Sequence, residues 1–86
     1  MKSINVCFKK VLYGDDKDTI LAVLLDERLF DVVYCFSLFG GSSSRLVQEI
    51  KSSCSNANAK EYLSTMTALK KEYPNSKINV KRNLKS

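Results

Sequence analysis

The spacing of apolar residues predicts strands in the first half of the chain. Residues 3–12 begin with alternating apolar and polar side chains, which is typical of a strand with one buried face. The most regular alternation runs over residues 29–39, after a turn at residues 26–28. Residues 19–25 are apolar at almost every position, and on a helix these side chains would not gather on one side. We therefore expect a central strand there and a three-stranded meander overall.

The second half of the chain has the spacing of helices. Apolar residues three and four positions apart predict a helix over residues 44–53, capped at its start by a serine. A second helix follows Asn58, which has the spacing of a capping box with Glu61, and this helix ends before Pro74 because proline supplies no amide. Residues 76–82 alternate again and predict a short basic strand at a sheet edge.

These elements give the order β-β-β-α-α-β in one domain that spans residues 1–86. We expect an α+β fold of two layers, an antiparallel sheet with both helices packed on one face. One alternative stays open: if Asp18 caps a helix that runs to residue 29, the order becomes β-α-β-α-α-β and the sheet contains a parallel pair. The segment Ile4-Asn5-Val6 recurs as Ile78-Asn79-Val80, which we interpret as coincidence rather than as an internal repeat.

Two helices on one face would leave the other face of the sheet bare. That face has apolar residues where a solvated face would be polar. They are Val11, Tyr13, Val33, Cys35 and Phe39. Either a helix covers them, or this face is an interface, with a second copy of the chain in a homodimer or with a partner protein.

The net charge of +5 lies entirely in the second half of the chain. Residues 1–43 carry five cations and six anions, whereas residues 44–86 carry nine cations and three anions, so the sums are −1 and +6. A basic half beside a near-neutral, apolar half indicates a binding surface for a protein or nucleoprotein complex.

The second predicted helix presents a row of polar side chains opposite its apolar stripe. Such a row of cations and hydroxyls suits a phosphate backbone, and the last strand would extend it if the two lay alongside. The candidate residues for binding nucleic acid or an acidic partner are Lys60, Ser64, Thr67, Lys71, Lys77, Lys81 and Arg82. An ordinary solvated helix face has the same pattern, and no aromatic or helix-turn-helix signature of nucleic-acid binding accompanies it.

A glycine- and serine-rich segment between the third strand and the first helix is the candidate for binding a phosphate. Glycine lets backbone amides approach an anion, and the start of a helix leaves amides unpaired. The segment comprises Gly40, Gly41, Ser42, Ser43, Ser44 and Arg45. It lacks the lysine of a P-loop, so a strand-to-helix connector with a serine cap is the simpler interpretation.

The residue types argue against catalysis and against a bound metal. The chain has no histidine, and its three cysteines are widely spaced, which fits reduced buried thiols better than a zinc site. Asp15, Asp16 and Asp18 lie in a predicted turn and lack the spacing of a calcium loop. No nucleophile has a recognisable base, so we expect no enzyme, no cofactor and no metal.

Nothing in the sequence predicts a membrane protein. The longest apolar stretch, residues 20–25, is far shorter than the roughly 20 residues that a membrane-spanning helix needs. The first residues lack the continuous apolar region and the cleavage site of a secretory signal. We therefore expect a soluble protein of the cytoplasm.

These features together predict a small, non-catalytic binding protein that acts stoichiometrically on a larger protein or nucleoprotein complex. The general profile is similar to that of small inhibitors encoded by phages and mobile elements, including anti-CRISPR proteins, although no motif carries the likeness. A nucleic-acid-binding module that uses the basic half is one alternative. Binding of a phosphate ligand at the Gly-Gly-Ser-Ser-Ser segment is the other.

Overall fold

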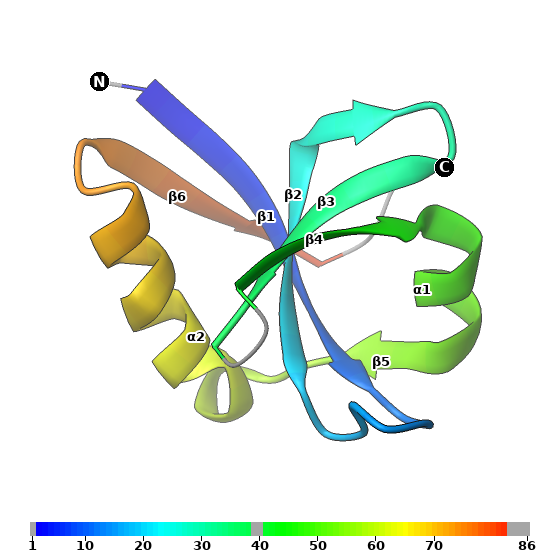
Figure 1. The fold of residues 1–86 in the computed structure, drawn as a ribbon. Helices are drawn as coiled ribbons and strands as arrows, with labels where there is room; N and C mark the ends of the chain where they lie inside the picture. Colours follow the sequence, from blue (N-terminus) through cyan, green and yellow to red (C-terminus); the bar gives the residue numbers. More distant parts are fainter. Residues whose placement is uncertain (1, 39–40, 83–86) are drawn as a thin grey trace.

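The chain folds into one twisted, six-stranded sheet with two helices in the computed structural model, which describes residues 2–38 and 41–82 (Figure 1). The strands are β1 (Lys2–Val11), β2 (Ile20–Leu29), β3 (Val32–Ser37), β4 (Gly41–Leu46), β5 (Cys54–Asn56) and β6 (Ser76–Lys81). The helices are α1 (Val47–Ser53) and α2 (Ala59–Glu72). The fold is α+β, as predicted, and the strand predicted over residues 19–25 is confirmed as part of β2.

β1 lies in the middle of the sheet, and other strands pair with it along both of its edges. β2 pairs antiparallel with one edge, and β3 and β4 extend the sheet from there. The other edge is shared, because β6 runs parallel to the first part of β1 and β5 runs antiparallel to its end. β5 and α2 carry the chain back toward the start of β1, and the turn after Tyr73 then reverses it. The sheet is therefore antiparallel except between β1 and β6, which corrects the expectation of an entirely antiparallel sheet.

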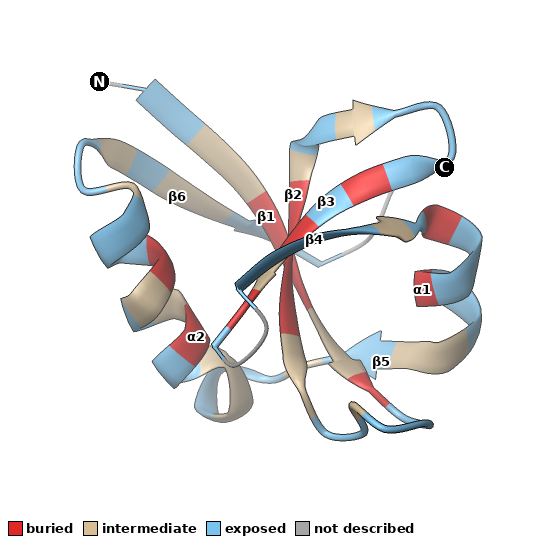
Figure 2. Ribbon diagram, viewed as in Figure 1, coloured by how far each residue is buried: buried red, intermediate tan, exposed pale blue. Residues whose placement is uncertain are grey.

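Each face of the sheet has its own apolar core. On one face, Val47 and Ile50 of α1 pack with Cys7, Val11, Leu21, Val23, Val33 and Cys35. On the other face, Leu69 of α2 packs with Val6, Phe8, Ala22 and Leu24. Successive residues of β1 and β2 alternate between the two cores, as strand geometry requires, and Figure 2 shows buried positions on both helices and along the middle strands. The two cores explain why residues 20–25 are apolar without a break.

The two helices cover opposite faces of the sheet, so the prediction that both pack on one face is wrong. Because the middle strands are apolar on both sides, each face needs a cover, and the chain supplies one helix to each. The face predicted to be bare is the one that α1 covers, with Val11, Val33 and Cys35 buried beneath it. Tyr13 is exposed after the end of β1, and Phe39 lies outside the described residues. That face therefore needs no homodimer or partner protein to cover it.

The serine-rich segment forms a strand and not the cap of a helix. From Gly41 to Leu46 it pairs in register with β3. α1 begins only at Val47, and its N-cap residue Leu46 makes no side-chain capping hydrogen bond. Small polar residues have loop character on their own, but the edge of β3 offers them a ladder in which every second residue is hydrogen-bonded. The order is therefore β-β-β-β-α-β-α-β rather than β-β-β-α-α-β.

The second helix begins as the sequence predicts. The Glu61 amide donates to Asn58 Oδ1 at 2.8 Å, and the Asn58 amide donates to Glu61 Oε1 at 3.1 Å, which completes a capping box. Lys10 Nζ lies 2.8 Å from Glu61 Oε2, so the start of α2 is also tied to β1. Among the described residues, neither helix is long and apolar enough to cross a membrane.

The two Ile-Asn-Val segments lie side by side in the sheet. Residues 4–6 of β1 pair in parallel register with residues 78–80 of β6. The side-chain amide of Asn79 donates to Asn5 Oδ1 at 3.4 Å, and the Asn5 amide donates to Asp26 Oδ2 at 3.1 Å. The recurrence of Ile-Asn-Val, which the sequence alone led us to interpret as coincidence, therefore places identical residues opposite one another on neighbouring strands, on the same face of the sheet.

Candidate functional site

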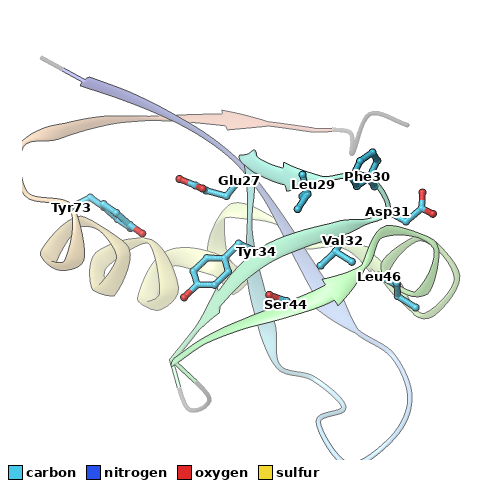
Figure 3. Close-up of a pocket in the computed structure, with 9 residues that line it drawn as sticks. All are labelled: Glu27, Leu29, Phe30, Asp31, Val32, Tyr34, Ser44, Leu46 and Tyr73. Carbon is cyan, nitrogen blue, oxygen red and sulfur yellow. The ribbon is translucent and has the colours of Figure 1, made fainter.

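A groove opens at the end of the sheet that α2 does not cover (Figure 3). It has a volume of about 720 Å³ and lies between the β2–β3 hairpin, β4 and the end of α2. Its lining residues are Glu27, Leu29, Phe30, Asp31, Val32, Tyr34, Ser44, Leu46 and Tyr73. We call this surface the apolar groove.

The floor of the apolar groove is a row of side chains from three neighbouring strands. Leu29 pairs with Val32, and Val32 pairs with Leu46, so the three apolar side chains lie on the same face. This is the same face of the sheet that α2 covers farther along the strands. Tyr34 lies two residues from Val32, so both side chains point to one face, and Tyr34 pairs with Leu24, which packs with α2. The row lies beyond the end of α2, and Leu29 is 70% exposed.

Phe30 stands at the tip of the β2–β3 hairpin in a conformation that suits few residues. Its side chain is 85% exposed, and its backbone φ is +57°, in the left-handed region. Two-residue hairpin turns place Asn, Asp or Gly in that region, and it costs other residues roughly 1–2 kcal/mol. Because the ring is so exposed, it packs little against its own chain, and packing therefore offsets little of this cost. Backbone strain of this kind is characteristic of functional sites.

Two hydrogen bonds hold the hairpin tip in place. Arg28 Nε donates to the Phe30 carbonyl at 3.0 Å, and the Val47 amide at the start of α1 donates to the Asp31 carbonyl at 2.7 Å. The tip is therefore fastened both to its own strand and to the neighbouring helix. Phe30 is presented from an ordered turn, which lowers the entropy cost of using it for binding.

The rim of the apolar groove is polar and carries acidic side chains. Figure 3 shows Glu27 near the α2 end of the groove and Asp31 near the hairpin tip. Tyr34 and Tyr73 lie at the α2 end. Burial raises the pKa of Tyr73, and the nearby Glu27 and Tyr34 raise it further, so its hydroxyl stays protonated and can donate a hydrogen bond. The groove thus offers an apolar floor between two carboxylates and two phenols.

The candidate basic residues are divided between the two faces of the sheet. Along α2, the exposed residues of the predicted row are Lys60, Ser64, Thr67 and Lys71. Lys77 lies on the face away from α2, because its neighbour Ile78 packs against the α2 core. Lys81 and Arg82 border a separate hollow at the start of α2. β6 therefore does not extend the α2 row into one continuous basic surface.

The predicted anion-binding segment lacks the geometry on which that hypothesis depends. Gly40 lies outside the described residues, and residues 41–45 belong to β4, whose backbone pairs with β3. Arg45 Nη2 lies 2.7 Å from Asp16 Oδ2, so the guanidinium already has an acidic partner. α1 begins two residues later, at Val47. Residues 41–45 therefore form an extended strand and are neither a loop nor the start of a helix.

The thiols are poorly placed for chemistry. Cys7 and Cys35 are buried and Cys54 is half-buried, and all three are free. Burial raises the pKa of each thiol, that of Cys35 to about 11, so little thiolate is present at neutral pH. Within residues 2–38 and 41–82, no group of three His, Cys, Asp or Glu side chains is placed to hold a metal ion.

Of the residues that line the apolar groove, sequence reasoning singled out Ser44 alone, and as part of an anion-binding segment. The alternation over residues 29–39 is typical of a strand, and it hides the turn at Phe30 and Asp31, which contains no glycine or asparagine. The charges at residues 26–28 favoured a turn there, but these residues continue β2 to Leu29. The available signal was two consecutive apolar residues between Arg28 and Asp31, which break the alternation at the point where the chain turns.

No family model matches the sequence, and neither the curated proteins nor the solved structures include a significant match to it. Function therefore has to be inferred from the groove itself.

Proposed function

We propose that this protein is a non-catalytic binding protein that acts stoichiometrically on a larger protein or nucleoprotein complex, with the apolar groove as its contact surface. The observation that carries the proposal is Phe30, an aromatic side chain that is 85% exposed on a strained turn. Each Å² of apolar surface left in water forgoes about 25 cal/mol, which burial against a partner recovers. An exposed apolar patch with a polar rim is typical of a protein interaction site.

The rim of the groove favours a partner of particular chemistry. Glu27 and Asp31 attract cations, whereas the row from Leu29 to Leu46 favours apolar side chains. Tyr34 and Tyr73 offer an apolar ring and a hydrogen-bonding hydroxyl each, the combination that protein interfaces use most. A partner surface with apolar side chains next to a lysine or arginine would satisfy both the floor and the rim.

The thiols do not favour catalysis by a cysteine. A catalytic cysteine requires a thiolate and an adjacent base. The environments of Cys7, Cys35 and Cys54 have the opposite effect, since burial keeps each thiol protonated.

The more specific form of the proposal is that binding inhibits the partner. To test it, the protein is mixed one-to-one with the isolated partner, and the partner should lose its activity.

The test is affinity capture from native cell lysate treated with nuclease, at low and at moderate salt. The wild type is compared with Leu29→Ser in the groove, and the matched control is Leu63→Ser, at an exposed position of α2 outside the groove. The proposal expects one protein partner whose capture persists after nuclease treatment and at moderate salt. Leu63→Ser should capture as much of this partner as the wild type, and Leu29→Ser should capture at least tenfold less. Equal capture by both variants would contradict the proposal.

Binding of nucleic acid is the second candidate, and the exposed row on α2 is the observation that favours it. Phosphate contacts release counterions, so such binding should weaken steeply as salt is added. The double variant Lys60→Ala with Lys71→Ala should then bind nucleic acid less well and show a shallower dependence on salt. Recovery of nucleic acid alone from the lysate, lost with added salt, would favour this function over the apolar groove.

A further inference from the structure

The outer edge of β4 lies beside the apolar groove and is open to another strand. β4 is the last strand of the ladder on its side, and its residues from Gly41 to Ser44 are exposed and include neither a charge nor a proline. Edge strands normally carry lysine, proline or a bulge that prevents pairing with another chain. The opposite side of this sheet follows that rule, because β6 carries Lys77 and Lys81 and β5 has only three residues. Over the described residues 41–44, the edge of β4 has no such protection, and Arg45, which follows them, is paired with Asp16.

The register of β4 determines which of its backbone groups face outward. The Val47 amide donates to the Asp31 carbonyl at 2.7 Å. This pair continues the register of β3 and β4 by one residue beyond Val32 and Leu46. Hydrogen-bonded and non-bonded pairs alternate along an antiparallel ladder, so every second residue counted back from Val47 bonds to β3. The residues whose amides face the open edge are therefore Ser42, Ser44 and Leu46; the carbonyls of Ser42 and Ser44 face it too, whereas that of Leu46, the N-cap of α1, accepts the first hydrogen bond of the helix.

These outward-facing groups are complementary to themselves. In a second copy placed antiparallel about a two-fold axis at Ser44, Ser44 meets Ser44 and Ser42 meets Leu46. The outward-facing amides of Ser44 and Leu46 and the carbonyls of Ser42 and Ser44 then have partners in the other copy. Arg45 does not face its own copy in this register, so like charges do not meet. On the groove side, Leu46 lies beside Ser42 of the second copy, whose neighbour on β3 is Phe36.

The distribution of charge also fits a second copy at this edge. Arg45 is already paired with Asp16. The cations of β6 lie at the far edge of the sheet, beyond β3, β2 and β1, and those of α2 lie on the helix that packs over β2. Two basic chains joined at β4 would therefore keep their most basic regions apart, which limits the repulsion between them.

We propose that the protein forms a two-fold symmetric homodimer in which the β4 strands of two copies pair antiparallel and continue the sheet from one chain into the other. A two-fold interface uses the same patch on both chains and closes the assembly at two copies. The two apolar grooves then lie on one face on either side of the axis. The dimer does not depend on the proposed binding function, because backbone groups of β4 hold it, although the side chains of Ser44 and Leu46 also line the groove.

The test measures molar mass in solution by light scattering over a range of concentrations. The wild type should have twice the mass of one chain. Ser44→Lys places two like charges on the two-fold axis, and Ser44→Pro removes an outward-facing amide, so each should give monomers with unchanged circular dichroism. Ser64→Lys on α2 is the matched control and should stay dimeric.

A cross-linking variant tests the register itself. Opposed residues of a hydrogen-bonded antiparallel pair have Cα atoms about 5.5 Å apart, within the range of a disulfide. Ser44→Cys should therefore form a covalent dimer on mild oxidation, and Ser64→Cys should not. A monomeric wild type at all concentrations, or a dimer that both Ser44→Lys and Ser44→Pro leave intact, would overturn the proposal. A monomer that loses its protein partner on Ser42→Lys, at an outward-facing position that does not line the groove, would instead assign the edge to a strand of that partner.

Discussion

Two residues with side chains adopt left-handed backbone conformations among those described, and they differ in what stabilises them. Asp18, with φ of +72°, has a short polar side chain of the kind that tolerates this region, and its amide donates to the Val11 carbonyl at 2.8 Å. Phe30 has a bulky ring that gains nothing from the conformation and remains in solvent. In the proposed binding role, the Phe30 ring is exposed because its contacts are with a partner outside the chain.

Phe30→Asn should stabilise the folded protein. Asparagine adopts the left-handed region at little cost, so the free energy of unfolding should rise by about 1 kcal/mol. Urea titration followed by circular dichroism measures the change. Phe30→Leu is the control, because leucine is also disfavoured there and should leave the free energy of unfolding near that of the wild type. A lower free energy of unfolding for Phe30→Asn would mean that the ring stabilises the fold.

The ion pair at the start of α2 should make stability depend on pH. The hydrogen bond from Lys10 and that from the Asn58 amide lower the pKa of Glu61 below its ordinary value of 4.5. A group whose pKa is lower in the folded state stabilises that state above its unfolded pKa and loses the effect as pH falls through the folded pKa. Glu61→Gln should therefore flatten the loss of stability below pH 4.5, measured by urea unfolding at several pH values. An unchanged slope would show that the pair contributes nothing.

At the scale of elements, the sequence predicts well those parts whose signal is local. β1 alternates, and α2 has its own cap, its own apolar stripe and a proline after its end. β4 and β5 have no such signal, because a run of serines and a strand of three residues become strands only when a neighbouring strand offers its edge. The packing of α1 and α2 on opposite faces was likewise not predicted, although the unbroken apolar run at residues 20–25 already required two covers.

The candidate site was harder to predict than the fold. Leu29, Val32 and Leu46 come from three strands, and each resembles an ordinary strand residue in its own segment. They become a site because α2 ends before it reaches them, which depends on how the chain is arranged in space. The residues singled out from the sequence were polar ones, and the structure divides these between both faces of the sheet and pairs Arg45 with Asp16.

Leu69→Ala tests the packing of α2 on its face of the sheet. Leu69 is fully buried against Val6, Phe8 and Leu24, so the substitution leaves a cavity and should lower the free energy of unfolding by about 2–5 kcal/mol. Thermal melting followed by circular dichroism detects the loss. The matched control is Leu63→Ala on the exposed face of the same helix, where we expect a change of about 0.5 kcal/mol or less. Similar losses for the two variants would contradict the assignment of the buried face.

At the scale of the whole molecule, the two helices cover different parts of the two faces of the sheet. α1 protects one face and α2 the other, and each leaves part of its face in solvent. The part left by α2 next to β4 is apolar and becomes the groove, whereas the part left by α1 next to β6 is polar, with Asn5, Asn79 and Lys77. The apolar groove and the cations of α2 and β6 therefore occupy different parts of the surface, and variants of one leave the other intact.

The most direct test of the apolar groove as a binding surface sets partner capture against stability in a single variant, Phe30→Asn. The binding account predicts that this variant is at least as stable as the wild type and yet loses its nuclease-resistant protein partner, while the double variant Lys60→Ala with Lys71→Ala keeps that partner. Full capture by Phe30→Asn, or loss of the partner only in the lysine variant, would contradict the account.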